Sequence, residues 1–227
     1  MSRYQYLLFD ADNTLFDFDA ANHNAFAKTC EYCGLTYSEE LYEFYESINR
    51  PLWHQLDKGE VTKEFLVVER FRRFLAAMNV EADPAECNRI QLAGLGSSTV
   101  LLPHALEVVQ TLAQTHKLYI VTNAVASVQR SRLTTSQIAP YITDAFISEE
   151  AGAAKPSRAY FDYVFARIDG ITRDNCLVIG DSLSSDVQGA INAGLPACWY
   201  NLKNEPRPEG MAIDYVIRDL RELYDIV

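Results

Sequence analysis

The apolar segment Tyr6–Phe9, which ends at Asp10, constrains the fold of this chain more than any other feature. Four apolar or aromatic residues stop at a carboxylate, Asp12 follows two positions later, and the turn-forming Asn13 comes next. A short apolar run in front of a turn signal predicts a buried strand, here over residues 4–9. The last residue of such a strand lies at the carboxyl edge of a sheet, where open α/β folds bind their ligands.

Two carboxylates at such an edge need a positive partner. A hard cation with oxygen ligands is the simplest one, which favours Mg²⁺, with Mn²⁺ as a conceivable substitute. An ionised Asp10 beside a metal could attack phosphorus and form an aspartyl phosphate. Asp12 could then protonate the leaving oxygen and later activate water. The alternative is an acidic turn without chemistry, because Asp and Asn are common turn residues.

Most of the remaining chain alternates between strand-like and helical patterns. Apolar runs predict strands over residues 118–121, 145–147, 176–179, 197–200 and 215–217. Helical spacing predicts helices over residues 103–115, 126–135, 157–168 and 184–193, and a last one after Asp219. Strands that alternate with helices imply an α/β fold with a doubly wound, Rossmann-like parallel sheet.

The stretch between the first two strands has a different texture. Helical spacing appears in four pieces, at about residues 20–33, 38–56, 62–79 and 83–95, with no strand-like run between them. We therefore predict two parts, an α/β core formed by residues 1–18 and 97–227, and an inserted all-helical domain formed by residues 19–96.

Polar residues follow other predicted strands as well. Thr122 and Asn123 come after the second strand, and Asp181 comes after the strand over residues 176–179. Because the carboxyl ends of parallel strands face one crevice, these residues should meet Asp10 there. Thr122 and Asn123 could bind phosphoryl oxygens, and Asp181 could complete the metal site. A Thr122 that merely begins a turn is the alternative.

Lys155 stands among small residues in front of Pro156, which is an unusual setting for a solvated charge. It could neutralise a transferring phosphoryl group, whose charge spreads over its equatorial oxygens. A surface position is the commoner fate of a lysine. Asp186 lies in the first turn of a predicted helix, where it could orient Lys155 or a metal-bound water. Its alternative role is to complement the helix dipole.

The composition narrows the range of partners. The 227 residues are 48% hydrophobic, which suffices for a large core, and carry a net charge of −11. So acidic a chain argues against binding to nucleic acids or anionic membranes. A metal and a lysine can still attract a small anion locally. The sequence shows no pattern of a signal peptide or of a membrane span. Its five cysteines have irregular spacings, which are typical of reduced thiols. A cytoplasmic protein is expected, and the sequence does not indicate its oligomeric state.

Taken together, these motifs resemble those of the haloacid dehalogenase superfamily. The four matching motifs are Asp10-x-Asp12-x-Thr14, Thr122, Lys155 and Gly180-Asp181-x4-Asp186. Their order and spacing agree with the superfamily along the whole chain, and the helical insertion is similar to the superfamily's helical cap of the first type.

The resemblance implies a magnesium-dependent phosphatase. It assigns Asp10 as the nucleophile and Asp12 as the general acid and base. Asp10, Asp181 and the backbone carbonyl of Asp12 would hold Mg²⁺, while Thr122 and Lys155 would contact the phosphoryl group. Two further residues, Thr14 and Asp186, would support this set.

Several longer segments resemble one family within the superfamily, the noncanonical pyrimidine nucleotidases. The segments are Asp10–Phe16, Asn49–Trp53, Ile147–Pro156 and Ala190–Trp199. This resemblance implies a 5′-nucleotidase that acts on pyrimidine monophosphates such as UMP, dUMP and dTMP. Asn13 and Ala124 replace glycines that are common in the superfamily, which alters loop freedom near the phosphate but removes no catalytic group.

Other readings of the same residues remain open. A 2-haloacid dehalogenase would need neither a second acid nor a metal, so Asp12 argues against it. A sugar-phosphate phosphatase or a phosphomutase would share every core residue and differ in the cap. A non-catalytic binding protein would have no need for intact Asp10, Asp12, Lys155 and Asp181.

The inserted helices should select the substrate, because the core recognises only phosphate. Trp53 could stack on a base, and Arg50 or His54 could hydrogen-bond near it. The alternatives are core packing for Trp53 and an ordinary surface position for His54. Phe16, at the hinge into the insertion, could line the pocket or pack in the core.

Overall fold

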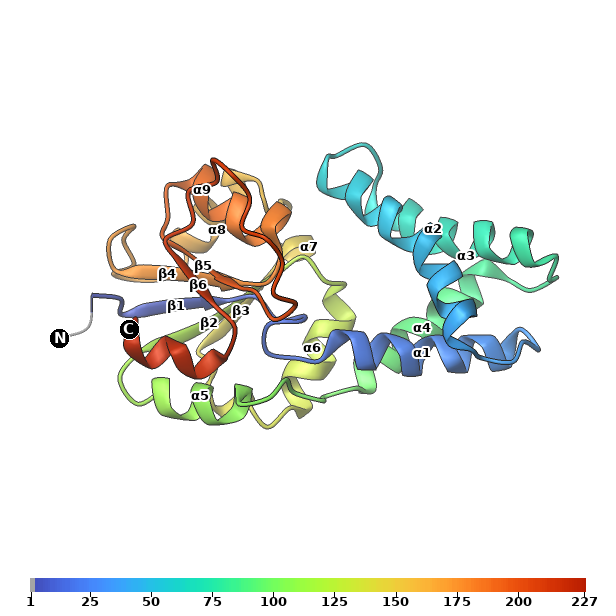
Figure 1. Cartoon of the computed structure of the whole chain (residues 1–227), viewed down its shortest axis with the longest axis horizontal. Coiled ribbons are helices and arrows are strands. Elements are labelled where there is room, and N and C mark those ends of the chain that lie inside the picture. The colour runs from blue at the N-terminus through green and yellow to red at the C-terminus, as the bar shows by residue number, and fades with distance from the viewer. Residues whose placement is uncertain (1–2) are drawn as a thin grey trace. The chain divides into compact units, whose positions relative to one another are not determined.

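The computed structural model describes residues 3–227, except for the side chain of Asp57. The described chain divides into two compact units. The first unit contains the chain up to Asp17 and from Thr99 onward, and the second contains Phe18–Ser98. Figure 1 shows strands and helices in the first unit and helices in the second.

The first unit is built on one six-stranded sheet with the order β3-β2-β1-β4-β5-β6. All five neighbouring pairs are parallel. The strands are β1 (Tyr6–Phe9), β2 (Lys117–Thr122), β3 (Asp144–Ile147), β4 (Cys176–Gly180), β5 (Ala197–Tyr200) and β6 (Tyr215–Ile217). The predicted α/β class with a doubly wound parallel sheet is confirmed.

Strand β1 is buried on both faces, as a central parallel strand must be. Successive side chains point to opposite faces, so Leu7 and Phe9 join one apolar cluster while Tyr6 and Leu8 join the other. Helix α5 (Ala105–Leu112) and the 3₁₀ helix η3 (Leu220–Asp225) contribute to the first cluster. Helices α8 (Arg158–Phe165) and α9 (Gln188–Ala193) contribute to the second. Two cores therefore fix the sheet between helical layers.

Short elements complete the first unit. They are α6 (Ala126–Thr135), the 3₁₀ turn η1 (Ala139–Tyr141), α7 (Ser148–Ala151) and the π-helical turn η2 (Leu183–Val187). Some predicted boundaries were wrong. Helix α5 begins at Ala105 and not at residue 103, because His104 has a left-handed backbone with φ 65°. Helix α8 ends at Phe165, three residues early, and α7 was not predicted at all.

The second unit consists of four helices. They are α1 (Phe18–Tyr32), α2 (Glu39–Asp57), α3 (Lys63–Met78) and α4 (Pro84–Ser97). Three of these helices begin with a side-chain N-cap, since Ser38, Thr62 and Asp83 each accept a backbone N–H of the helix that follows. Aromatic side chains fill the interior, and the rings of Phe26 and Tyr45 stack with centroids 4.4 Å apart.

The chain leaves and re-enters the first unit through two paired segments. Phe16 and Leu101 form an antiparallel bridge. The backbone N–H of Asp17 donates to Val100 O at 3.0 Å, and that of Leu102 donates to Leu15 O at 2.9 Å. These bonds hold the exit and the return of the chain side by side at the root of the insertion.

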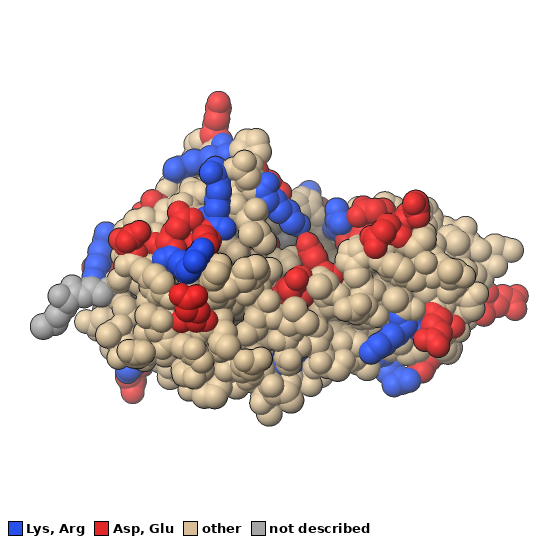
Figure 2. All heavy atoms as spheres, turned by 60° about the horizontal axis from the view of Figure 1, so that its bottom comes forward, with Lys and Arg blue, Asp and Glu red and all other residues tan. Residues whose placement is uncertain are grey.

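The distribution of charged side chains on the surface and the reduced state of the cysteines agree with what the composition suggested. On the face shown in Figure 2, acidic and basic side chains lie in small scattered groups, and no basic band crosses the residues drawn in colour. Within the described part of the chain, no helix is long and apolar enough to cross a membrane. All five cysteines are thiols, as predicted, with the Cys33 and Cys87 sulfurs 3.5 Å apart.

Candidate active site

A fully buried lysine lies at the carboxyl edge of the sheet. The Lys155 ammonium donates to Asp10 Oδ1 at 2.6 Å, to Asp186 Oδ1 at 2.6 Å and to Val121 O at 2.7 Å. Lys155 is 2% exposed, so the surface alternative is excluded. A buried charge is tolerated only when it is paired and hydrogen-bonded, and these three acceptors meet that condition. The structure thus brings Lys155, Asp10 and Asp186 together.

Asn123 fixes the loop that carries Lys155. Its side-chain amide donates to Lys155 O at 2.7 Å, and its side-chain carbonyl accepts the Lys155 N–H at 2.9 Å. Both ends of the amide are therefore engaged with the backbone of Lys155. One N–H of the amide is used in this pair, so a phosphate contact from Asn123, as predicted from the sequence, would need another of its N–H groups.

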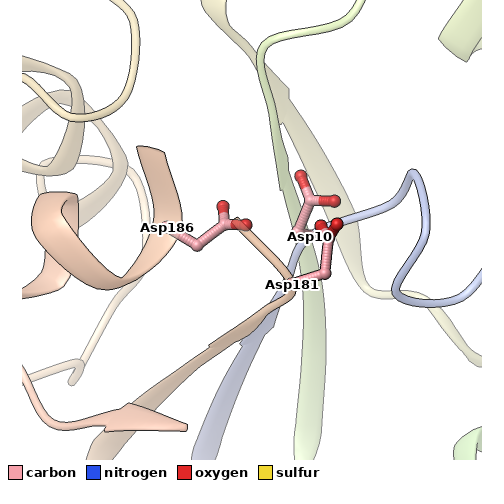
Figure 3. A group of neighbouring side chains, drawn as sticks. All are labelled: Asp10, Asp181 and Asp186. Atoms are coloured by element: carbon pink, nitrogen blue, oxygen red, sulfur yellow. The ribbon is translucent and has the colours of Figure 1, made fainter. Parts of the chain in front are cut away.

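Asp181 joins Asp10 at the same edge. Strands β1 and β4 are neighbours, with Phe9 opposite Ile179, so the residues that follow each strand lie close together. One carboxylate oxygen each from Asp10, Asp181 and Asp186 lies within 4.8 Å of the others. Figure 3 shows the three side chains converging from the ends of the two strands and from the turn after β4.

The close spacing of the three carboxylates and their burial shift the pKa values of the cluster. Burial raises the pKa of Asp10 to about 7, against the opposing charge of Lys155. Burial, together with repulsion from Asp10 and Asp186, also raises the pKa of Asp181. Burial lowers the pKa of Lys155, but the attraction of Asp10 and Asp186 outweighs it and the net shift is upward. One ammonium cannot neutralise three carboxylates, so the cluster attracts a further cation.

The donor set fits a hard divalent cation. Its ligands are carboxylate oxygens, which suit Mg²⁺ and Ca²⁺ better than softer metals. The backbone of Asp181 is held in place by a hydrogen bond, in which Trp199 Nε1 donates to Asp181 O at 2.8 Å. Asp10, Asp181 and Asp186 are thus the described residues that could hold such an ion.

Gly180 has a role that the sequence did not reveal. A Cβ on Gly180 would lie 2.3 Å from Asp186 Cγ, far inside van der Waals contact. The absence of a side chain lets Asp186 pack against the end of β4, where its Oδ2 accepts the Ser182 N–H at 3.0 Å. Gly180 therefore makes room for Asp186.

Thr122 ends β2 inside a hydrogen-bonded framework. Its backbone N–H donates to the Tyr160 hydroxyl at 3.0 Å, and that hydroxyl donates to Phe146 O at 2.6 Å. The Thr122 hydroxyl accepts the Ala124 N–H at 3.1 Å, and its own hydrogen can still be donated. Tyr160, which sequence reasoning did not single out, fixes the ends of β2 and β3 at the site.

Asp12 faces a cation that was also missed. Arg132 Nη1, on α6, donates to Asp12 Oδ1. Arg132 is fully buried, and its guanidinium carbon lies 4.2 Å from the ring centroid of Phe16. The signal was the spacing from Val128 to Arg132, which places both on the buried side of one helix. The turn at Asn13 has a left-handed backbone conformation, with φ 58°.

Thr14, which was expected to support the catalytic residues, and Phe16, which was expected at the hinge into the insertion, are both buried in the first unit. Thr14 has no exposed surface, and its hydroxyl has no hydrogen-bond partner among the described residues. Phe16 is likewise fully buried and belongs to the core cluster of the first unit. Core packing is therefore the role that its position supports, in preference to a pocket lining.

The predicted substrate residues lie on α2 in the second unit. Trp53 is partly buried, and its Nε1 donates to Asn49 Oδ1 at 3.1 Å. Arg50 is exposed and donates to Glu46 Oε2 at 2.9 Å, while His54 is exposed. The structure thus fixes the indole of Trp53 through Asn49 and leaves Arg50 at the surface.

Comparison with known proteins identifies the class. Residues 7–200 match the family model of the Haloacid dehalogenase-like hydrolases, and the chain belongs to that family.

Several relatives match over nearly their whole length. The chain is 37% identical to YfnB of Bacillus subtilis, named as a HAD-hydrolase, over 100% of this chain and 97% of the relative. It is 31% identical to the pyrimidine 5′-nucleotidase YjjG of Escherichia coli, over 99% and 98% of the two chains. It is 32% identical to the pyrimidine 5′-nucleotidase PynA of Streptococcus pneumoniae, over 98% and 95%.

Solved structures show the same fold. A crystal structure of YfnB from Bacillus subtilis, bound to magnesium, superposes with a TM-score of 0.94 and covers 99% of both chains at 37% identity.

Proposed function

We propose that this protein is a magnesium-dependent phosphomonoester hydrolase, specifically a 5′-nucleotidase for pyrimidine nucleoside monophosphates such as UMP, dUMP and dTMP. The observation that carries the proposal is the Lys155 ammonium, buried between Asp10 and Asp186 at the sheet edge. The substrate class is supported by two pyrimidine 5′-nucleotidases that match along nearly the full chain. It rests on them and on the resemblance of the motifs.

In the first half-reaction, Asp10 is the nucleophile. One of its carboxylate oxygens attacks phosphorus in line, and the bond from phosphorus to the nucleoside 5′ oxygen breaks. The electron pair of that bond goes to the leaving oxygen, which takes a proton from Asp12. Lys155 and the Thr122 hydroxyl stabilise the charge on the phosphoryl oxygens, and the products are an aspartyl phosphate and a nucleoside.

In the second half-reaction, Asp12 acts as a base. It takes a proton from water while the water oxygen attacks phosphorus, and the bond from phosphorus to the Asp10 oxygen breaks. The Asp10 carboxylate is restored and inorganic phosphate leaves. Asp12 ends the cycle protonated, ready to donate to the next leaving oxygen.

Asp10, Asp181 and the backbone carbonyl of Asp12 would hold Mg²⁺, with Asp186 close to the same space. When bound, the ion supplies positive charge that offsets repulsion between the nucleophile and the anionic substrate. Asp186 would also position Lys155, to which it is hydrogen-bonded at 2.6 Å. Thr14 and Asn123 would support the two loops that bring these groups together.

A phosphate-release assay tests the proposal. Pyrimidine monophosphates, purine monophosphates and ribose 5-phosphate are compared with and without Mg²⁺. We expect the highest kcat/KM with a pyrimidine monophosphate, loss of activity in EDTA and recovery when Mg²⁺ is added back. The Asp10→Asn variant should lose essentially all turnover. Asp162→Asn, which changes a carboxylate that is 63% exposed on α8, is the matched control and should keep it.

The outcomes separate the parts of the proposal. Release of phosphate without any divalent ion, or by Asp10→Asn, would refute the mechanism. A preference for ribose 5-phosphate would leave the mechanism and refute the nucleotidase assignment.

Trp53 is the residue to which we assign recognition of the base. Its indole N–H is already bonded to Asn49, so we assign the contact with the base to the aromatic ring and not to the N–H. Stacking on an aromatic ring is worth roughly 1–3 kcal/mol per base. Trp53→Ala should lower kcat/KM for UMP by roughly 5- to 150-fold and leave kcat/KM for ribose 5-phosphate unchanged. An equal loss for both substrates would argue against stacking.

A further inference from the structure

We propose that Arg132 is a positioning residue, which fixes the direction of the Asp12 carboxylate for its proton transfers. The proposal rests on the function proposed above, in which Asp12 serves as general acid and base. It assigns to a helix outside the four sequence motifs a direct influence on the chemical step.

The burial of Arg132 is the first observation. Arg132 has no exposed surface, which is rare for an arginine and costly unless its charge is paired. Its guanidinium donates to Asp12 Oδ1, lies over the ring of Phe16 and reaches Gln129 Oε1 at 3.4 Å. The planar group is thus held by three different neighbours, and its direction is well defined.

The anchoring of α6 is the second observation. The Ala126 N–H at the start of α6 donates to Glu149 Oε2 at 3.0 Å. Further along, Arg130 donates to Glu150 Oε1 at 3.0 Å and to Ala145 O at 3.1 Å. The helix that carries Arg132 is therefore fixed to α7 and to the start of β3, so its guanidinium is held on a rigid support.

The asymmetry of the Asp12 carboxylate is the third observation. Oδ1 is bound by Arg132, whereas Oδ2 has no hydrogen bond to any described residue, and the side chain is 22% exposed. Arg132 thus holds one oxygen and leaves the other to exchange a proton.

In the proposed step, Oδ2 of a protonated Asp12 gives its proton to the leaving 5′ oxygen as the bond from phosphorus to that oxygen breaks. In the return step, the same Oδ2 takes a proton from the attacking water. Arg132 gains and loses no proton in either step. Without it, the Asp12 carboxyl can rotate, and a misdirected proton donor can cost about 100-fold in rate.

Leaving groups of different basicity test this inference. An alkoxide leaving group such as the nucleoside of UMP needs a proton as it departs, whereas p-nitrophenolate departs without one. We compare kcat/KM for UMP and for p-nitrophenyl phosphate in Arg132→Met, because kcat/KM reports the steps up to phosphoryl transfer. We expect a loss on the order of 10- to 100-fold for UMP and less than about threefold for p-nitrophenyl phosphate.

A second readout follows the return step. If water activation is slowed, the aspartyl phosphate accumulates, and p-nitrophenol should appear in a pre-steady-state burst of about one equivalent per active site. Arg132→Lys keeps a positive charge and one donor towards Oδ1, so it should recover part of the UMP activity. Ser127→Ala, which changes an exposed residue of the same helix that takes no part in its anchoring, should leave the ratio of the two substrates at the wild-type value.

Each result decides the inference. Equal losses for both substrates in Arg132→Met, or a wild-type ratio, would overturn it. Failure of both Arg132 variants to fold would mark Arg132 as a structural residue and would overturn it as well. A wild-type protein that hydrolyses neither substrate would refute the phosphatase function itself, which is a different result from an unchanged ratio.

Discussion

Replacing Gly180 by alanine is predicted to destabilise the core through Asp186. The new Cβ would lie 2.3 Å from Asp186 Cγ and 2.6 Å from Asp186 Cβ. The backbone of Gly180 is not left-handed, so steric overlap and not φ strain is the cause. The Asp186 side chain must move, and either its bond to Lys155 or its bond to the Ser182 N–H is lost.

The magnitude follows from two contributions. Overpacking of a close-packed site costs about 1–3 kcal/mol, and loosening a buried ion pair costs up to about 3–5 kcal/mol. We expect a loss of about 3 kcal/mol in the free energy of unfolding. For a chain of this size that corresponds to a decrease in Tm of roughly 6–12 °C.

A double-mutant cycle identifies the cause. Asp186→Ala removes the Cγ and Oδ2 that the new methyl group would meet at 2.3 Å, together with the bonds to Lys155 and Ser182, and leaves only the Cβ at 2.6 Å. Gly180→Ala should therefore cost less in an Asp186→Ala background. Urea unfolding in magnesium-free buffer should give a coupling energy of about 2 kcal/mol. The control is Gly94→Ala, whose Cβ would meet Ala25 at 2.7 Å in the second unit and should be additive with Asp186→Ala. Additive costs for Gly180→Ala and Asp186→Ala would refute the reasoning.

Three shorter predictions address the metal, the framework and the pH dependence. Mg²⁺ at 100 times its Kd should add about 2.7 kcal/mol of stability, and Asp181→Asn should abolish the shift seen by differential scanning fluorimetry. Tyr160→Phe should cost about 2–4 kcal/mol in urea unfolding, because a buried N–H and a buried C=O each lose their partner. Hydrogen bonds from Arg72 and then Arg73 lower the pKa of Glu69 to about 2, below its unfolded value near 4.3, so Glu69→Gln should cost about 1 kcal/mol at neutral pH. That cost should persist above about pH 4 and vanish as the pH falls towards 2, and a difference that stays constant with pH would contradict it.

Much of the fold was predictable because its signals are local. A continuous apolar run such as Tyr6–Phe9 identifies a strand buried on both faces, and its place in the centre of the sheet bears this out. Caps such as Ser38 and Thr62 also act within a few residues of their helices. Helix α5 was mispredicted because His104 adopts a left-handed backbone, a conformation that is uncommon for residues other than glycine.

Only part of the site was predictable from the sequence, because some of its contacts depend on how distant segments pack. The sequence suggested that Asp10 and Asp181 meet, because strand ends converge in a parallel sheet, and that Asp186 could orient Lys155. Arg132 and Tyr160 could not be placed in the same way, since each reaches the site from a helix through a side chain. Their partners lie 120 and 38 positions away in the chain, and only packing decides such contacts.

The paired segments at the root of the helical unit have a consequence for how such proteins diversify. Because Phe16 bridges to Leu101, the two junctions of the insertion are tied by core bonds whatever lies between them. A different insertion could then replace this one at two neighbouring points, while the first unit keeps the bonds that hold it together. Substrate repertoire and reaction chemistry would be inherited as separable modules, and chimaeras joined at these points are the natural proteins in which to reassign specificity.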